Sequence, residues 1–124
     1  MRINDPAVLA EVEACFDAYE RALVGNDVPT LDALFWDSPL TLRYGATENL
    51  VGTEAIRAFR AARPARGLAR EVLERHVTTF GEDFAVASIV FRRGGEPRLG
   101  RQTQTWVRLD GAWRVVAAHV SWMA

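Results

Sequence analysis

The spacing of apolar residues changes near Leu68, and this change divides the chain into a helical part and a strand-rich part. In the first segment the apolar positions lie three or four residues apart, at Leu9, Val12, Phe16, Tyr19 and Leu23. Such a stripe is typical of an amphipathic helix. We therefore predict a helix over residues 5–25, with Asp5 as its N-cap and Pro6 in its first turn.

The segments that follow are shorter and alternate between helical and extended patterns. Residues 27–35, DVPTLDALF, indicate a short second helix with a proline in its first turn. Residues 37–45 are predicted to be extended, and residues 48–52 to return beside them as a short hairpin arm. A third helix is predicted over residues 53–63, with Thr53 as its N-cap.

Beyond Leu68 the apolar residues alternate, which predicts strands. Four long runs separated by turn sequences form this part: 68–80, 83–93, 98–109 and 112–123. The fold class is therefore α+β, with three N-terminal helices packed on a strongly curved, mainly antiparallel sheet and a short hairpin between helices two and three. A curved sheet wrapped around the first helix would form a half-open cone, and its mouth would be a natural site for a small molecule.

Composition limits the choices further. The chain has 124 residues, 49% of them apolar and 25% charged, which fits one globular domain spanning 1–124. Its formal net charge of −1 gives no reason to expect nucleic acid or an acidic membrane as a partner. The first residues resemble neither a signal peptide nor a membrane span, so we expect a soluble, cytoplasmic protein.

Chemistry that depends on metals or cofactors has little support in the sequence. The chain has two histidines and one cysteine, Cys15, and neither histidine has ligand partners at metal-binding spacing. His76 is accompanied by Glu74 but by no third ligand. No glycine-rich phosphate loop or nucleophile elbow is present. We therefore predict no metal and no cofactor.

Arg43 raises a more informative question, because it stands in the middle of the extended segment LTLRYG. If Leu42 and Tyr44 pack into the core, Arg43 is a charge in solvent. If instead Thr41 and Arg43 face inward, the guanidinium points into a cavity at an anion. Periodicity alone leaves both interpretations open, since either face of a strand can be the buried one.

A family resemblance bears on this question. The strings YERALVGND, LFWDSPLTLRYGATENLVG, AIRAFRAARP and GRQTQTWVRLDGAWRVVAAHVSWM resemble the AtzH/HpxZ group over residues 15–123. This group lies within the cone-shaped superfamily of nuclear transport factor 2, ketosteroid isomerase and SnoaL-type cyclases. The resemblance implies decarboxylation of 1,3-dicarboxyurea to allophanate, or a role in oxalurate breakdown. It also implies that Tyr19 and Arg43 are the catalytic residues.

Other residues are candidates for binding a small anionic substrate. We expect His119 and Ser121 to share a face with Val115 on the last strand, where a cavity role and a core role are equally open. The face of Gln102, Gln104 and Trp106 suits a planar, urea-like molecule, although the glutamines could instead pair on an exposed sheet. Asn49, after the turn, is a weaker candidate. For a dianion a second cation is needed, and His119, Arg63 or Arg70 could supply it.

Three functions remain open at this point. The first is a cofactor-independent decarboxylase in which Arg43 anchors the anion and Tyr19 donates a proton or hydrogen bond. The second is an oxalurate-catabolism accessory protein or a non-enzymatic binding module, with homodimerisation through the sheet compatible with every reading. The third is an isomerase or cyclase, which needs an inward carboxylate as base, for which Asp37, Glu48 and Glu74 are poor candidates.

Overall fold

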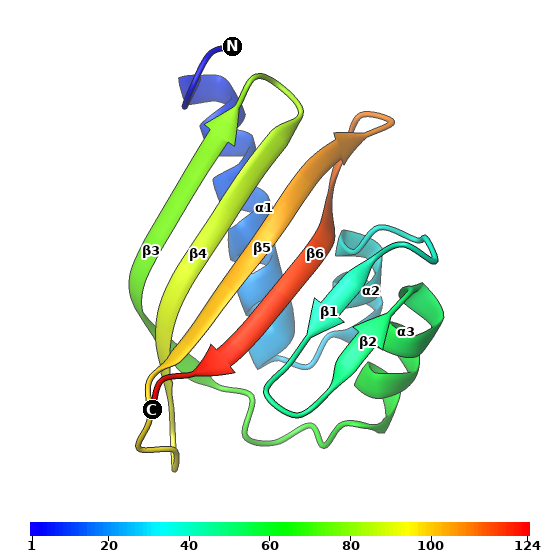
Figure 1. The fold of residues 1–124 in the computed structure, drawn as a ribbon, viewed down its shortest axis with the longest axis vertical. Coiled ribbons are helices and arrows are strands. Elements are labelled where there is room, and N and C mark those ends of the chain that lie inside the picture. Colours follow the sequence, from blue (N-terminus) through cyan, green and yellow to red (C-terminus); the bar gives the residue numbers. More distant parts are fainter.

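The computed structural model describes residues 1–124 as three helices and a six-stranded sheet (Figure 1). The helices are α1 (Pro6–Val24), α2 (Val28–Leu34) and α3 (Thr53–Ala62). The strands are β1 (Leu42–Tyr44), β2 (Asn49–Val51), β3 (Arg70–Phe80), β4 (Phe84–Arg93), β5 (Gly100–Leu109) and β6 (Ala112–Trp122). The order of elements and the predicted α+β fold class are confirmed, and the extended segment at 37–45 shortens to three paired residues.

Helix α1 begins and ends where its sequence predicts. The Asp5 carboxylate accepts hydrogen bonds from the backbone N–H groups of Ala7 and Val8, and Pro6 occupies the first helical position. The helix then lies across one face of the long strands, as Figure 1 shows. None of the three helices combines the length and the apolar character that a membrane crossing requires.

The sheet has the strand order β2-β1-β6-β5-β4-β3. Strands β3 to β6 form the predicted antiparallel meander, and β1 and β2 form the predicted hairpin. The hairpin joins the meander because β1 runs parallel to β6, with Arg43 opposite Ala118. This parallel pairing brings the hairpin to the mouth of the cone.

A bulge in β6 decides which side chains face the helices. Thr105 pairs with Ala117 but Trp106 pairs with Val115, so Val116 is an extra residue on β6. Because side chains alternate along a strand, one extra residue reverses the faces beyond it. Val115 and Ala118 are accordingly both buried against the helices.

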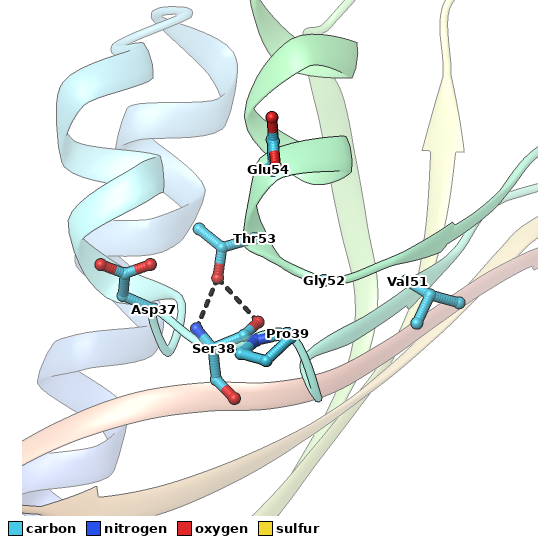
Figure 2. A pocket seen from close by; sticks show the side chains of 7 residues that line it. All are labelled: Asp37, Ser38, Pro39, Val51, Gly52, Thr53 and Glu54. Atoms are coloured by element: carbon cyan, nitrogen blue, oxygen red, sulfur yellow. Dashed lines mark hydrogen bonds between the residues drawn. The ribbon is translucent and has the colours of Figure 1, made fainter.

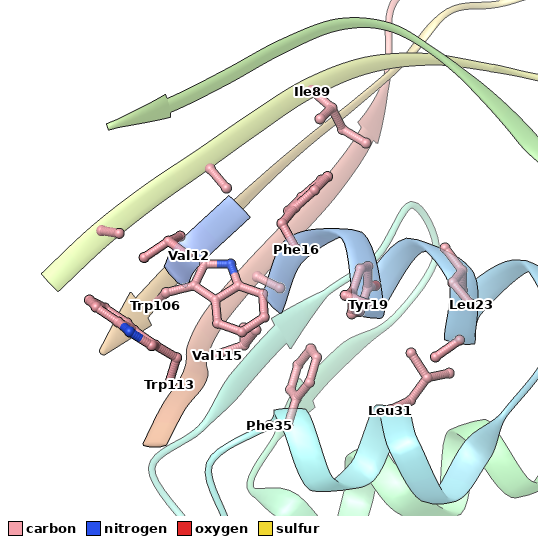
Figure 3. Packing of buried hydrophobic residues seen from close by; sticks show 14 of the residues in the cluster. Val12, Phe16, Tyr19, Leu23, Leu31, Phe35, Ile89, Trp106, Trp113 and Val115 are labelled. Carbon is pink, nitrogen blue, oxygen red and sulfur yellow. The ribbon is translucent and has the colours of Figure 1, made fainter. Parts of the chain in front are cut away.

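The core lies between α1 and the sheet (Figure 3). Phe16 from α1, Trp106 from β5 and Val115 from β6 are completely buried. Burying each of these side chains stabilises the fold by about 1.5–3 kcal/mol. Phe35, at the end of α2, packs against the ring of Tyr19 and closes the core toward the hairpin.

The start of α3 is fixed by a tertiary contact that was not predicted. The helix is capped by Gly52, whose φ of 89° suits glycine, and not by Thr53 as predicted. The Thr53 hydroxyl instead accepts a hydrogen bond from the backbone N–H of Ser38 at 2.6 Å and lies 3.0 Å from the Ser38 carbonyl oxygen (Figure 2). It also lies 3.0 Å from the carbonyl oxygen of Trp36. These bonds join α3 to the segment between α2 and β1, and so position the arginines of α3 relative to Arg43.

Candidate functional site

A cavity of about 290 Å³ opens between the β1–β2 turn, α3 and the ends of β4 and β6. Its walls are formed by Arg43, Gly45, Ala46, Thr47, Glu48, Phe59, Arg63, Leu68, Arg93, Val120 and Trp122. Three of these residues are arginines and only one is acidic. The remaining walls are largely apolar, so charges inside the cavity are less well screened than on an open surface.

Arg43 points into this cavity from β1. Its side chain is 12% exposed, lies over the Phe59 ring at 4.9 Å, and donates a hydrogen bond of 2.8 Å to Glu48. Leu42 and Tyr44 line a hollow on the opposite face of the sheet. Of the two orientations that the sequence left open, the structure has the inward one.

Glu48 reaches Arg43 by folding back over Gly45. A Cβ atom at Gly45 would lie 1.8 Å from the Glu48 carboxylate, so glycine leaves the room for this approach. Burial alone would raise the pKa of Glu48, but hydrogen bonds from Thr47 and Arg43 outweigh it and lower that pKa below its usual value. The carboxylate of Glu48 thus occupies one side of an arginine that a ligand carboxylate could also bind.

Arg63 and Arg93 complete the positive wall and have no carboxylate partner. Nε and Nη2 of Arg63 and Nε of Arg93 are buried and make no hydrogen bond within the chain. Burial lowers the pKa of both groups, and the positive charge of Arg43 lowers them further, with Arg70 acting on Arg93 as well. Partly buried charges whose buried nitrogens have no partner are costly, so these two groups are suited to an anionic ligand.

Two further arginines lie behind the cavity, and each has an acidic partner. Arg60 donates to Asp32 at 2.9 Å and stacks on Phe35, while Arg70 donates to both carboxylate oxygens of Glu20. Both arginine side chains are 2% exposed. With Glu48 on Arg43, the five arginines are matched by three carboxylates, which leaves two positive charges in excess.

Tyr19 lies next to this group on the inner face of α1. It is 5% exposed, and its ring packs between neighbours Phe16 and Phe35, each with centroids 6.3 Å away (Figure 3). Tyr19 is not part of the cavity wall, but it lies within electrostatic range of Arg60 and Arg63. Its position is inward, as predicted, but outside the cavity lining that contains Arg43 and Arg63.

Two buried glutamines on β5 offer further donors. The side-chain oxygen of Gln102 accepts from Arg70, and that of Gln104 accepts from the indole N–H of Trp106. Because arginine and tryptophan only donate, the oxygen of each amide must face them. The amide nitrogens of Gln102 and Gln104 are therefore directed elsewhere, buried and without a partner.

The whole chain, residues 1–124, matches the model of the AtzH-like family. The chain belongs to the AtzH-like family. Among solved structures, a protein of unknown function from Pectobacterium atrosepticum, of the DUF3225 family, is 56% identical with a TM-score of 0.96, covering 98% of this chain and 95% of that one. A cystatin-like fold protein from Burkholderia xenovorans is 48% identical with a TM-score of 0.96, covering 100% and 98%.

More distant matches support the fold alone. An NTF2-like protein of unknown function from Pseudomonas putida is 22% identical, with a TM-score of 0.79, over 93% of this chain and 86% of that one. No curated protein matches the chain. The family resemblance and the cone fold predicted from the motifs are both confirmed, whereas the substrate stays a prediction.

Several predicted binding residues of this AtzH-like protein lie away from the cavity. The expectation that His119 and Ser121 share a face with Val115 is wrong, because the bulge at Val116 reverses the faces. His119 is exposed on the outer face of the sheet, edge-on to Tyr44. Ser121 pairs with the exposed Arg101 on that same face. Neither residue can reach the cavity of its own chain.

Trp106 and Asn49 are also displaced from their predicted roles. Trp106 is completely buried in the core, so it cannot stack on a ligand, although it holds the amide of Gln104 in place. Asn49 is exposed and pairs with Tyr44, which puts it on the outer face. Gln104 is on the inner face, which is one of the two positions that the sequence left open.

Three residues that line the cavity of this AtzH-like protein were not predicted from the sequence: Arg93, Phe59 and Trp122. For Arg93 a signal was present: it shares alternation with the buried Ile89 and Phe91 in IVFRR, which predicts an inward side chain. Alternation alone gives the wrong face for Trp122, because the bulge at Val116 reverses the side chains that follow it. No group of three or more potential metal ligands occurs in the chain, and the absence of a metal stays a prediction.

Proposed function

We propose that this AtzH-like protein is a cofactor-independent decarboxylase of an N-carboxylated urea, converting 1,3-dicarboxyurea to allophanate. The observation that carries the proposal is the excess of positive charge around an otherwise largely apolar cavity. Such a cavity favours a small, multiply charged anion over a neutral substrate. The family resemblance supplies the chemical identity of that anion.

The reaction requires a cavity that excludes water from the substrate and a group that supplies a proton. Loss of CO₂ from an N-carboxylate breaks the bond between nitrogen and the carboxylate carbon and leaves the electron pair on nitrogen, which takes up one proton. Phe59, Leu68 and Trp122 form walls that exclude water from the bound substrate. Arg43 holds one carboxylate of the substrate, and its charge-assisted hydrogen bonds fix the reacting geometry.

Tyr19 is the proposed source of the proton. A phenol hydroxyl carries a proton that it can donate to a hydrogen-bonded partner. Because Tyr19 is not part of the cavity wall, the proton would reach the substrate nitrogen through a bridging water. The tyrosine regains its proton from solvent after CO₂ has left.

The proposal is tested with purified protein and enzymatically generated 1,3-dicarboxyurea, following the rate at which allophanate appears. Tyr19→Phe and Arg43→Gln should each lower the rate strongly. Their matched controls, Tyr44→Phe and Arg101→Gln, alter a tyrosine and an arginine on the outer face and should leave it unchanged. A wild-type rate equal to spontaneous decay would rule out the proposed activity.

An isomerase of the steroid-isomerase type is less well supported. Such an enzyme needs a free carboxylate as base, yet Glu48 is paired with Arg43, and Asp37 and Glu74 are largely exposed. A binding module in oxalurate breakdown would use the same cavity without turnover. It is distinguished by tight binding of the anion with no acceleration of its decay.

The predicted homodimer is kept as a proposal, with a second copy as the partner of the outer sheet face. Leu42 and Tyr44 line a shallow apolar hollow there, and Val51 beside them is 59% exposed. Covering these side chains would remove apolar surface from water. Light scattering on a size-exclusion column tests it, and a monomer at micromolar concentration would count against it.

A further inference from the structure

We propose that Arg63 and Arg93 form a second anion subsite, and that this pair makes the cavity selective for substrates with two carboxylates. Arg43 would bind one carboxylate and the pair the other. The inference rests on the proposed function for the identity of the substrate. The selectivity itself concerns binding, so it can be measured without turnover.

The positions of the arginines support two subsites around a common aromatic wall. Arg43 and Arg63 both lie over the ring of Phe59, at 4.9 and 5.9 Å from its centroid. Arg93 lies over Trp122 at 5.5 Å. The rings shield the guanidinium carbons from water but leave the N–H groups at the edges free to bind oxygen atoms.

The backbone holds Arg63 and Arg93 at the cavity rather than in solvent. Arg63 is the C-cap of α3, with ψ of 138° and its N–H bonded to the Phe59 carbonyl at 3.1 Å, so the chain leaves the helix there. Arg93 is the last residue of β4 and pairs across the sheet with Arg70. Like charges on paired positions destabilise a sheet, and a bound anion would relieve this repulsion.

The other cations that could serve are already occupied or lie elsewhere. Arg70 donates to both oxygens of Glu20 and to Gln102, and Arg60 is paired with Asp32. His119 is on the outer face of the sheet. Glu96, whose charge acts on Arg93, is itself bound by Arg98.

Two arginines beside each other, with buried donors and no acid, indicate a ligand that brings its own negative charge. A guanidinium offers paired N–H groups that match the two oxygens of a carboxylate. One carboxylate bound by Arg43 and a second by Arg63 and Arg93 would also cancel the two positive charges in excess. A monoanion would leave one of these charges uncompensated.

The test compares two unreactive ligands by isothermal titration calorimetry. Glutarate carries two carboxylates separated by three atoms, as 1,3-dicarboxyurea does, and pentanoate replaces one of them by a methyl group. Wild-type protein should bind glutarate about tenfold to a hundredfold more tightly than pentanoate. Arg63→Gln and Arg93→Gln should each lose most of this ratio, while pentanoate binding is retained.

Controls separate this subsite from general effects of charge or folding. Arg101→Gln removes an arginine from the outer face and should keep the wild-type ratio. Arg63→Lys and Arg93→Lys preserve charge and should keep part of it, and circular dichroism verifies folding. Equal binding of the two ligands to wild-type protein, or an unchanged ratio in both glutamine variants, would overturn the inference.

The binding experiment and the decarboxylation assay can succeed or fail independently of each other. Selective glutarate binding without decarboxylation would support the subsite and contradict the proposed activity. Decarboxylation that persists in both glutamine variants, with no preference for glutarate, would support the activity and contradict the subsite.

Discussion

The inner face of the sheet has two ends that differ in chemistry. Around Phe16, Trp106 and Val115 the side chains are apolar and completely buried (Figure 3). Around Arg63 and Arg93 they are charged, partly buried and without partners. The difference indicates that packing at one end stabilises the fold, while the other end retains unfavourable charge that a ligand would neutralise.

The inward side chains change from apolar to polar along β4 and β5. Along β5, the buried positions run from Trp106 through Gln104 to Gln102, and along β4 the inward positions run from the buried Ile89 to the partly buried Arg93. The polar residues therefore gather where the hairpin and α3 close the cone. Substitutions at the two ends should accordingly affect stability and binding in opposite ways.

The largest expected effect comes from the packed end. Trp106→Ala should destabilise the fold by about 3–5 kcal/mol, because it leaves a cavity in the core. It also removes the indole donor that orients Gln104. Urea unfolding followed by circular dichroism measures the change, and a loss below about 1 kcal/mol would contradict the importance of this end.

Tyr19 lies between the two ends, and Tyr19→Phe tests its role in the reaction separately from its role in packing. The ring contacts with Phe16 and Phe35 are kept, so the free energy of unfolding should change little. If the hydroxyl supplies the proton, the rate of allophanate formation should fall about 100-fold or more. Comparable rates for Tyr19→Phe and the outer-face control Tyr44→Phe would show that the hydroxyl takes no part.

Arg93→Met should stabilise the free protein, by about 1 kcal/mol, because it replaces an unpaired, partly buried charge by an apolar side chain of similar length. The same variant should lose its preference for glutarate. Thermal unfolding without ligand, with glutarate and with pentanoate gives both quantities. A destabilised variant would indicate that Arg93 serves the fold rather than a ligand.

Glu48→Gln should have the smallest effect, a few-fold tighter binding of anions at Arg43, because a competing carboxylate is removed. The lowered pKa of Glu48 keeps it charged at neutral pH. The stability that it contributes is present above the usual carboxyl pKa of about 4.3 and is lost as pH falls through its lower folded value. Calorimetry at pH 7 is the measurement, and weaker anion binding by the variant would contradict the competition.

Much of the fold could be predicted because its signals are local. The cap at Asp5, the helical stripe from Val12 to Leu23 and the turn sequences of the meander each depend on neighbouring residues. The AtzH-like motifs identified the family, and alternation placed Gln104 on one strand face with Gln102 and Trp106. These features need no knowledge of distant contacts.

The candidate site depended more on tertiary structure. Periodicity left the face of Arg43 open, and it was decided by the parallel pairing of β1 with β6. The bulge at Val116 moved His119 and Ser121 outward and Trp122 inward, since one inserted residue reverses every later side chain.

The sequence by itself therefore determined the order of elements, the family and the inward stripe that carries Tyr19. Only the tertiary structure decided which arginines are neutralised, because Glu20, Asp32 and Glu48 find their partners through folding. Formal charge adds up along the chain without regard to place, and a net charge of −1 conceals a cavity with two unpaired arginines. Electrostatics depends on distance and burial, which the fold alone sets.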